Sequence, residues 1–141
     1  GMAPSELSSA LEHRSGLAGL AGTPDMRQVL QAEAGGDPGA ALAVATYLHR
    51  LRGGIAAMAA AMGGMDALVF TGGVGERSAS VRWRAAEGLG FLGVSLDRRA
   101  NQAASGDRRV SAQGSAVVAF VVEAREDLEI ARGTRWALGR P

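Results

Sequence analysis

The sequence of 141 residues contains no cysteine and no lysine, and aromatic residues make up only 4% of it. Without cysteine, the chain has no disulfide framework, no thiolate chemistry and no cysteine-based metal site. Because large rings are scarce, a core must form by close approach of backbones that carry small side chains such as alanine and glycine. The length suffices to bury such a core, and we expect a single domain over residues 2–141.

The sequence also lacks a strong net charge and a long apolar run. The formal net charge is +1, and the 15 cationic residues are all arginine, scattered in pairs such as Arg82 and Arg84 that are typical of solvated faces. We therefore expect no binding to nucleic acid or membranes. The longest apolar run, Ile55 to Met62, is too short to cross a bilayer, and no signal peptide is evident. These features predict a cytoplasmic protein.

The first part of the sequence is predicted to be mostly helical. Residues 4–13 can form a short helix, whereas the glycines in 15–22 predict an ordered loop. A stronger helix start follows, in which Thr23 is the expected cap, Pro24 takes the first helical position and Asp25 faces the helix dipole.

A second, longer helix is predicted from Asp37-Pro38 to about Met62, where Gly63-Gly64 stops it. Apolar residues at spacings of three and four predict one buried stripe: Val44, Leu48, Leu51, Ile55, Met58 and Met62. Gly53-Gly54 interrupts this helix and predicts a kink or a close helix contact.

Two apolar runs, Asp66–Phe70 and Ala116–Val122, are predicted to be strands. Each leads into a helical pattern, the first at Ser78–Gly88 and the second at Glu126–Leu138. The continuous apolar character of Ala116–Val122 indicates a strand covered on both faces in a parallel sheet. The fold class is therefore predicted to be α/β.

A glycine cluster, Gly72-Gly73-Val74-Gly75, separates the first strand from its helix. Such a turn lets a ligand approach the backbone, and a helix N-terminus attracts anions and phosphates. The following Glu76-Arg77-Ser78 supplies neither the third glycine of a dinucleotide fingerprint nor the lysine of a P-loop. The residue types leave two interpretations open, a tight turn and a nucleotide-contacting loop.

Acidic residues at two helix starts also have two interpretations. Glu126-Asp127 follows a predicted buried strand, where these acids can complement the helix dipole or reach a phosphate-bound magnesium ion. Asp25 and Arg27 likewise fit a cap and a surface charge. The two histidines, His13 and His49, are too far apart in sequence to predict a metal pair.

Six stretches of the sequence occur together in a recognisable order: Ser15 to Gly22, Asp25-Met26-Arg27, Ala59 to Gly64, Phe70 to Glu76, Glu87 to Gly93 and Glu126 to Arg132. This series resembles the C-terminal part of acetate kinase over nearly the whole chain. The resemblance implies a partial ribonuclease-H-like (actin-like ATPase) domain, with a mixed sheet whose parallel core strands are packed by helices. It also implies transfer of phosphate from ATP to acetate, giving ADP and acetyl phosphate with Mg²⁺, and propionate kinase is similar in these stretches.

The resemblance implies roles for nine residues. Asp25, Met26 and Arg27 are expected to flank the adenine pocket, and Glu126 to associate with magnesium. The expected neighbours of the adenosine and its phosphates are Gly72, Gly73, Val74, Gly75 and Arg77. No catalytic residue is expected in this chain, because those of the family lie in stretches that precede this one.

The sequence departs from the family at two places. Arg77 stands where the family has asparagine, and Glu123-Ala124-Arg125 replaces a proline-threonine-asparagine run. Arg125 is placed to pair with Glu126, which would weaken metal binding.

The resemblance also implies missing neighbours. We expect no turnover by this chain alone, and a separately encoded N-terminal half would complete the enzyme. The strands around Val69 and Val118 are expected to have an uncovered edge, which favours a homodimer or a larger assembly. The alternative function is a non-catalytic module that oligomerises or binds nucleotide as a regulator.

Overall fold

The structure, a computed structural model, describes residues 1–139. The chain divides into two compact units, one formed by Gly1–Gly64 and the other beginning at Met65, and each is considered by itself. The single domain predicted for residues 2–141 stays a prediction. Within the described range, none of the helices combines the length and the apolar character that a membrane span requires.

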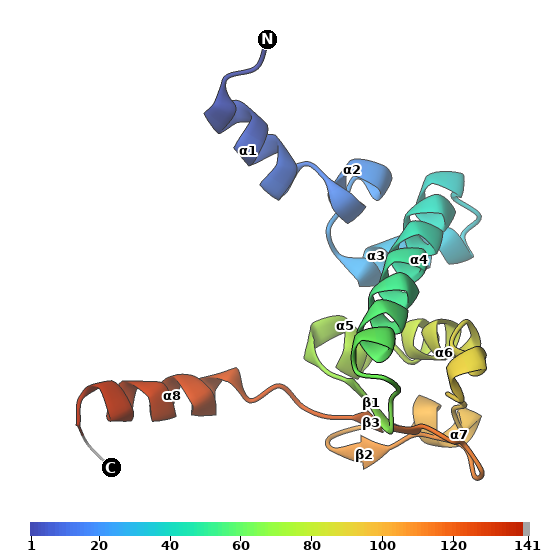
Figure 1. Cartoon of the computed structure of the whole chain (residues 1–141). Helices are drawn as coiled ribbons and strands as arrows, with labels where there is room; N and C mark the ends of the chain where they lie inside the picture. Colours follow the sequence, from blue (N-terminus) through green and yellow to red (C-terminus); the bar gives the residue numbers. More distant parts are fainter. Residues whose placement is uncertain (140–141) are drawn as a thin grey trace. The chain divides into compact units, whose positions relative to one another are not determined.

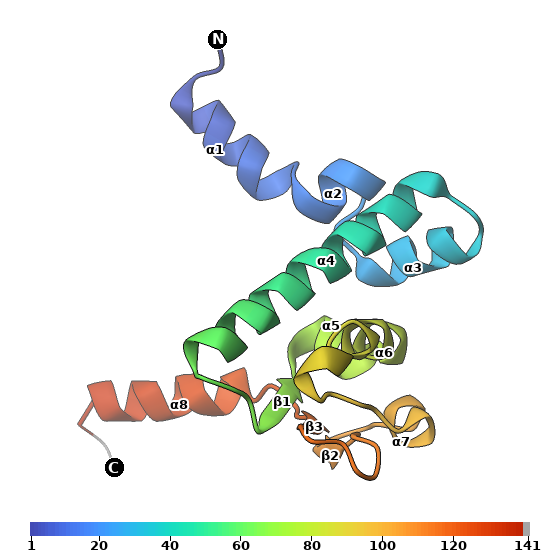
Figure 2. The same cartoon turned by 45° about the vertical axis from the view of Figure 1, so that its right-hand side comes forward.

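The first unit is entirely helical (Figure 1). Its elements are α1 (Pro4–His13), α2 (Gly16–Ala21), α3 (Met26–Ala34) and α4 (Pro38–Ala61). Helices α3 and α4 form a hairpin that turns at Gly35-Gly36, and α2 packs against both (Figure 2). The core of this unit is built from small or slender side chains, including Met26, Val29, Ala40, Ala43, Val44 and Leu48. Alanine at buried positions of α4 allows the close backbone approach that the scarcity of aromatic residues requires.

The long helix begins where the sequence predicts, because the carboxylate of Asp37 accepts a hydrogen bond of 2.7 Å from the amide of Ala40. Its apolar stripe is only partly buried. Val44 and Leu48 lie in the core, whereas Met58 and Met62 are 60% and 67% exposed. The stripe prediction is therefore wrong at Met58 and Met62, whereas Leu51 and Ile55 are half-buried.

Two other local predictions in this unit are wrong. The cap of α3 is Asp25, whose side chain accepts from the amide of Arg27, while Thr23 and Pro24 precede the helix. Residues 16–21 form a helix rather than a loop. Gly22 ends this helix in a left-handed conformation. At Gly53-Gly54 the predicted close helix contact is absent, because an added Cβ there would meet no atom within 4 Å, and the alternative of a kink stays a prediction.

In its described residues, 65–139, the second unit contains three strands and several short helices. Its elements are β1 (Ala67–Phe70), α5 (Gly72–Arg77), α6 (Ala79–Glu87), the 3₁₀ helix η1 (Gly90–Leu92), α7 (Arg98–Gln102), β2 (Arg108–Arg109), β3 (Val118–Val121) and α8 (Glu126–Ala137). In both views, α5 and α6 lie on the same side of the strands (Figures 1 and 2). The helix after β1 begins within the glycine cluster rather than at Ser78, which instead caps α6.

The sheet has the strand order β1-β3-β2. Strand β3 pairs in parallel with β1, from Ala67 opposite Val118 to Phe70 opposite Val121, and antiparallel with β2. This mixed sheet with a parallel pair confirms the predicted fold class. The uncovered edge is present at β1, where Val69 is 50% exposed, but Val118 lies on the central strand and the prediction is wrong there.

Candidate functional site

The candidate site lies where the two parallel strands end. Phe70 is the last residue of β1 and lies opposite Val121, the last residue of β3. The segments that follow, residues 71–77 and 122–125, therefore leave the sheet at the same end, the carboxyl end of the two strands. Ligands of open α/β sheets commonly bind beyond the carboxyl ends of the strands. The two segments are therefore the first place to look for function in this unit.

The glycines after β1 have different roles. Gly72 has a φ of +72°, a conformation that favours glycine, and it starts α5. A Cβ on Gly75 would lie 3.3 Å from the carbonyl carbon of Phe70, so this glycine lets the helix pack against the end of β1. A Cβ on Gly73, like one on Gly72, would meet nothing within 4 Å, so Gly73 is an open position at which a ligand can approach the backbone.

The carboxylate of Glu76 joins the two segments. Its Oε1 atom accepts a hydrogen bond of 2.8 Å from the amide of Gly72 and another of 2.8 Å from the amide of Ala124. The first amide of α5 therefore donates to a carboxylate of the chain itself, whereas the glycine pattern predicts an unpaired amide that binds an anion. No role for Glu76 could be predicted from the sequence, because its partner Ala124 is 48 residues away.

A buried arginine, Arg82, donates hydrogen bonds to the backbone of α5. Arg82 is 1% exposed, and its Nη1 atom donates to the carbonyls of Gly75 (2.9 Å) and Glu76 (2.7 Å). Its Nε and Nη2 atoms donate to the side chain (2.7 Å) and the carbonyl (2.6 Å) of Asn101. Asn101 is itself buried and donates to the carbonyl of Ala79 at 2.9 Å.

This arrangement corrects the interpretation of Arg82 as part of a solvated face. Burial lowers the pKa of its guanidinium below the ordinary value, although arginine stays charged at any physiological pH. The charge faces carbonyl and amide oxygens instead of a carboxylate. Because two of those carbonyls belong to the last turn of α5, Arg82 also complements the negative end of that helix.

A polar cleft of about 410 Å³ opens beside these groups. Its lining includes Glu76, Arg77, Arg82, Ser105 and Glu123. Arg77 is exposed. The cleft thus combines cationic and anionic side chains from both segments at the sheet edge.

The segment after β3 is held by a second carboxylate. Asp107 accepts from the amide of Glu123 and from the guanidinium of Arg125, each at 3.0 Å. These two bonds lower the pKa of Asp107 below the ordinary value. Arg125 therefore pairs with Asp107, and the expected pairing with Glu126 is wrong.

Glu126 opens α8 and is exposed in its first turn, together with Asp127 and Glu129. This acidic turn complements the positive end of the helix. Across residues 1–139, no group of three or more histidine or acidic side chains could hold a metal ion. A single exposed carboxylate still fits magnesium, which takes oxygen ligands and usually keeps several waters alongside phosphate oxygens.

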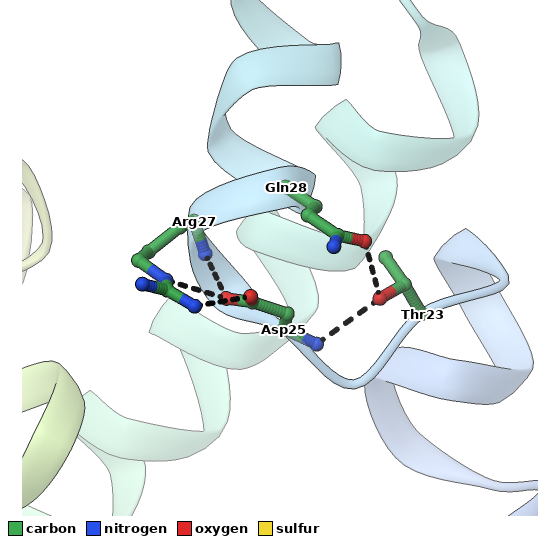
Figure 3. A network of polar contacts seen from close by, with 4 residues as sticks. All are labelled: Thr23, Asp25, Arg27 and Gln28. Carbon is green, nitrogen blue, oxygen red and sulfur yellow. Dashed lines mark hydrogen bonds and ion pairs between the residues drawn. The ribbon is translucent and has the colours of Figure 1, made fainter.

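Asp25, Met26 and Arg27 lie in the first unit at the start of α3. Figure 3 shows Asp25 and Arg27 with their neighbours Thr23 and Gln28. The Asp25 carboxylate forms a two-pronged ion pair with the guanidinium of Arg27, at 2.8 and 3.1 Å, and this pairing lowers the pKa of Asp25. Thr23 accepts from the amide of Asp25 and donates to Gln28. Met26 is buried in the core of the unit. An adenine pocket at these residues stays a prediction.

The predicted site residues thus form two groups. The glycine turn, Arg77 and the start of α8 belong to the second unit, and Glu76 links the turn to the segment that carries Glu126. Residues 25–27 belong to the first unit, which is described by itself.

Comparison with known proteins agrees with the resemblance in the sequence. A model of the acetokinase family matches residues 1–132. The chain is 46% identical to the acetate kinase of Deinococcus deserti over 141 residues, covering 98% of this chain and 35% of that protein. It is 50% identical to the acetate kinase of Leifsonia xyli over 133 residues, covering 94% of this chain and 34% of that protein.

Solved structures of kinases also match the chain. The Porphyromonas gingivalis acetate kinase superposes with a TM-score of 0.88 at 34% identity, covering 98% of this chain and 35% of that one. A propionate kinase from Francisella tularensis gives a TM-score of 0.85 at 34% identity, covering 93% of this chain and 33% of that one. The chain spans about a third of the length of the relatives it matches. By sequence and by fold, the chain belongs to the acetokinase family.

Proposed function

We propose that this chain is the nucleotide-binding part of an acetate-kinase-type phosphotransferase, which binds ATP or ADP together with Mg²⁺. The observation that carries the proposal is the meeting of the glycine turn and the segment before Glu126 at the carboxyl ends of two parallel strands. In an acetokinase-family chain, this edge combines an open backbone position at Gly73 with the start of a helix that carries an exposed carboxylate. The residues proposed to bind the nucleotide are Asp25, Met26, Arg27, Gly72, Gly73, Val74, Gly75 and Arg77.

Glu126 is proposed as the metal-associated carboxylate. Magnesium, when bound, neutralises the charge of the phosphates and orients them for transfer. Arg77, the exposed cation of the cleft lining, provides electrostatic complementarity to phosphate. Because Arg125 pairs with Asp107, its positive charge does not occupy the Glu126 carboxylate.

The acceptor in the proposed reaction is a short carboxylate, acetate or propionate, because the matched structures include kinases of both names. Its binding residues are not among those assigned in this chain, so we propose that turnover requires a partner segment. Self-association through β1 is supported by its place at the end of the strand order, and by the exposure of Val69 on a face of the sheet. Cytoplasmic localisation stays a prediction.

The test is isothermal titration of the full chain with ADP in the presence of magnesium. Gly73→Val places a branched side chain at the open position and should raise the Kd at least about tenfold, a loss of about 1.4 kcal/mol. Gly90→Val is the matched control, because Gly90 also lies in open space, in η1. Glu126→Gln should weaken binding only when magnesium is present.

Three outcomes would count against the proposal. Wild-type chain that gives no heat with millimolar Mg-ADP would leave the non-catalytic, oligomerising module as the function. Equal effects of the two glycine substitutions would show that the turn does not contact the ligand. An effect of Glu126→Gln that is the same with and without magnesium would remove the metal role of Glu126.

A further inference from the structure

The hydrogen-bond ladder of the sheet continues past its last strand residues. Along β3, successive backbone groups point to opposite neighbours. Val118 and Val122 donate to Asp66 and Phe70 on the β1 side, each at 2.9 Å, whereas the carbonyl of Ala119 accepts from the β2 side. Even-numbered amides therefore face β1 and odd-numbered amides face β2.

The next two amides keep this alternation, but their acceptors are side chains. Glu123 donates at 3.0 Å to the carboxylate of Asp107, which directly precedes β2. Ala124 donates at 2.8 Å to the carboxylate of Glu76 on α5, the helix that follows β1. Two carboxylates thus take the place of strand carbonyls, one on each side, and extend the central strand beyond its neighbours.

We propose that Glu76 is a positioning residue that fixes Glu126 relative to the glycine turn, and so couples magnesium binding to nucleotide binding. The inference rests on the proposed function, because it assigns Glu126 to the metal. Glu126 follows Ala124 by two trans peptides of 3.80 Å each, so their Cα atoms lie within about 7.6 Å of one another. Whatever anchors Ala124 therefore limits where the Glu126 carboxylate can reach.

Glu76 is suited to this role because its backbone carbonyl and its side-chain carboxylate are both hydrogen-bonded. Its carbonyl accepts from the buried guanidinium of Arg82, which holds the backbone, and its Oε1 atom also accepts from Gly72 at the start of the turn. A single oxygen thus binds the first amide of the turn and the anchoring amide of the metal-carrying segment. A shift of either segment would have to break one of these bonds.

The test compares Glu76→Ala with Glu76→Gln in the full chain. Since one oxygen accepts both bonds, the amide oxygen of glutamine can replace it, whereas alanine removes it. Glu87→Ala is the matched control: it removes an exposed glutamate of the same unit, whose carboxylate accepts from Trp83. Thermal unfolding of all variants establishes that they fold.

The first readout is amide hydrogen exchange without nucleotide. Glu76→Ala should speed exchange in residues 122–128 about tenfold, the factor expected for one lost hydrogen bond, while Glu76→Gln and Glu87→Ala leave it near the wild-type rate. Equal exchange in the alanine variant and the wild type would overturn the proposal. So would glutamine and alanine variants that exchange equally fast.

The second readout is the gain in ADP affinity that magnesium provides, measured as the ratio of Kd values without and with the ion. Glu76→Ala should lower this ratio about tenfold and have no further effect in a Glu126→Gln background, whereas Glu76→Gln should preserve it. An unchanged ratio in Glu76→Ala would overturn the coupling. A wild-type chain that binds no ADP would instead overturn the proposed function, and the exchange rates alone would then decide whether Glu76 positions the segment.

Discussion

Replacing Arg82 by methionine tests whether the buried guanidinium stabilises the second unit. Methionine keeps much of the volume of the side chain but removes all four hydrogen bonds that Arg82 donates. The acceptors would remain in place behind the glycine turn. Removal of one partner from a buried polar network leaves unsatisfied groups, which usually costs more than the bonds themselves contribute.

The magnitude follows from the burial of those acceptors. The side-chain and main-chain oxygens of Asn101 accept buried bonds, whereas the carbonyls of Gly75 and Glu76 are part-buried and can be hydrated after the substitution. An unsatisfied buried acceptor costs about 1–3 kcal/mol, so two of them give a loss of about 3 kcal/mol. For a chain of this size, that loss lowers Tm by roughly 10 °C.

The assay is urea unfolding followed by circular dichroism, with thermal unfolding as a second measure. Arg99→Met is the control, because Arg99 is exposed in α7 and its substitution should change stability by less than about 0.5 kcal/mol. Arg82→Lys should fall between the two, since an ammonium group lacks the fork that reaches Asn101 and the α5 carbonyls together.

A double substitution sharpens the result. Asn101→Ala removes the acceptor of one bond, so its effect and that of Arg82→Met should add up to more than the effect of the double variant, by about 1 kcal/mol. If Arg82→Met were as stable as Arg99→Met, the buried network would contribute nothing, and the role given to Arg82 would be refuted.

Three further predictions concern a tight contact, a titrating carboxylate and a helix cap. Gly75→Ala should be about 1 kcal/mol less stable than Gly73→Ala in urea unfolding, because only the first methyl meets backbone, at 3.3 Å; equal values would contradict the packing. The lowered pKa of Asp107 means that its stabilising contribution is present above the ordinary aspartate pKa of about 3.9 and is lost as pH falls through the folded-state value. Asp107→Asn should therefore flatten the acid limb of the stability–pH curve, and Arg125→Gln should flatten it less; an unchanged limb in Asp107→Asn would argue against the pairing. Asp37→Ala should lose about 1 kcal/mol and Asp37→Ser much less, and a thermal scan that shows no difference would reject the capping bond.

Local signals predicted the long helices well. The bounds of α4 follow from Asp37-Pro38 at one end and Gly63-Gly64 at the other, and those of α8 follow from the acidic start at Glu126. Such signals act within a few residues, so a sequence displays them directly. They were less decisive at α3, where Thr23 and Asp25 are both good caps and the structure uses the second.

Glycine-rich stretches were predicted less well, since glycine weakens a helix without excluding it. Residues 16–21 and 72–77 both form single helical segments, although their composition favours turns. The first packs against α3 and α4, and the second is held by Arg82 and Glu76. Tertiary contacts therefore override the local preference in both places.

The working parts of the candidate site were the hardest to foresee. The glycine turn and Glu126 could be assigned from motifs, but Glu76, Arg82 and Asn101 gained no role from the sequence. Each of them has a partner 19 to 48 residues away, and no periodicity or spacing encodes such pairings. A glutamate inside a glycine motif was the one available signal, because a charged residue there needs a partner.

The parallel pairing of β1 with β3 also determines when the site can form. Ala67 can pair only after Val118 has been synthesised, and the segment between them contains α5, α6 and α7. Closing a loop of about fifty residues costs roughly 3.5 kcal/mol in chain entropy before any contact compensates for it. At a synthesis rate of about 5–20 residues per second, β1 would leave the ribosome several seconds before its only strand neighbour among the described residues. The site should therefore appear late, in the same cooperative step as the sheet, while the helical hairpin of the first unit, built from local contacts, can already be folded.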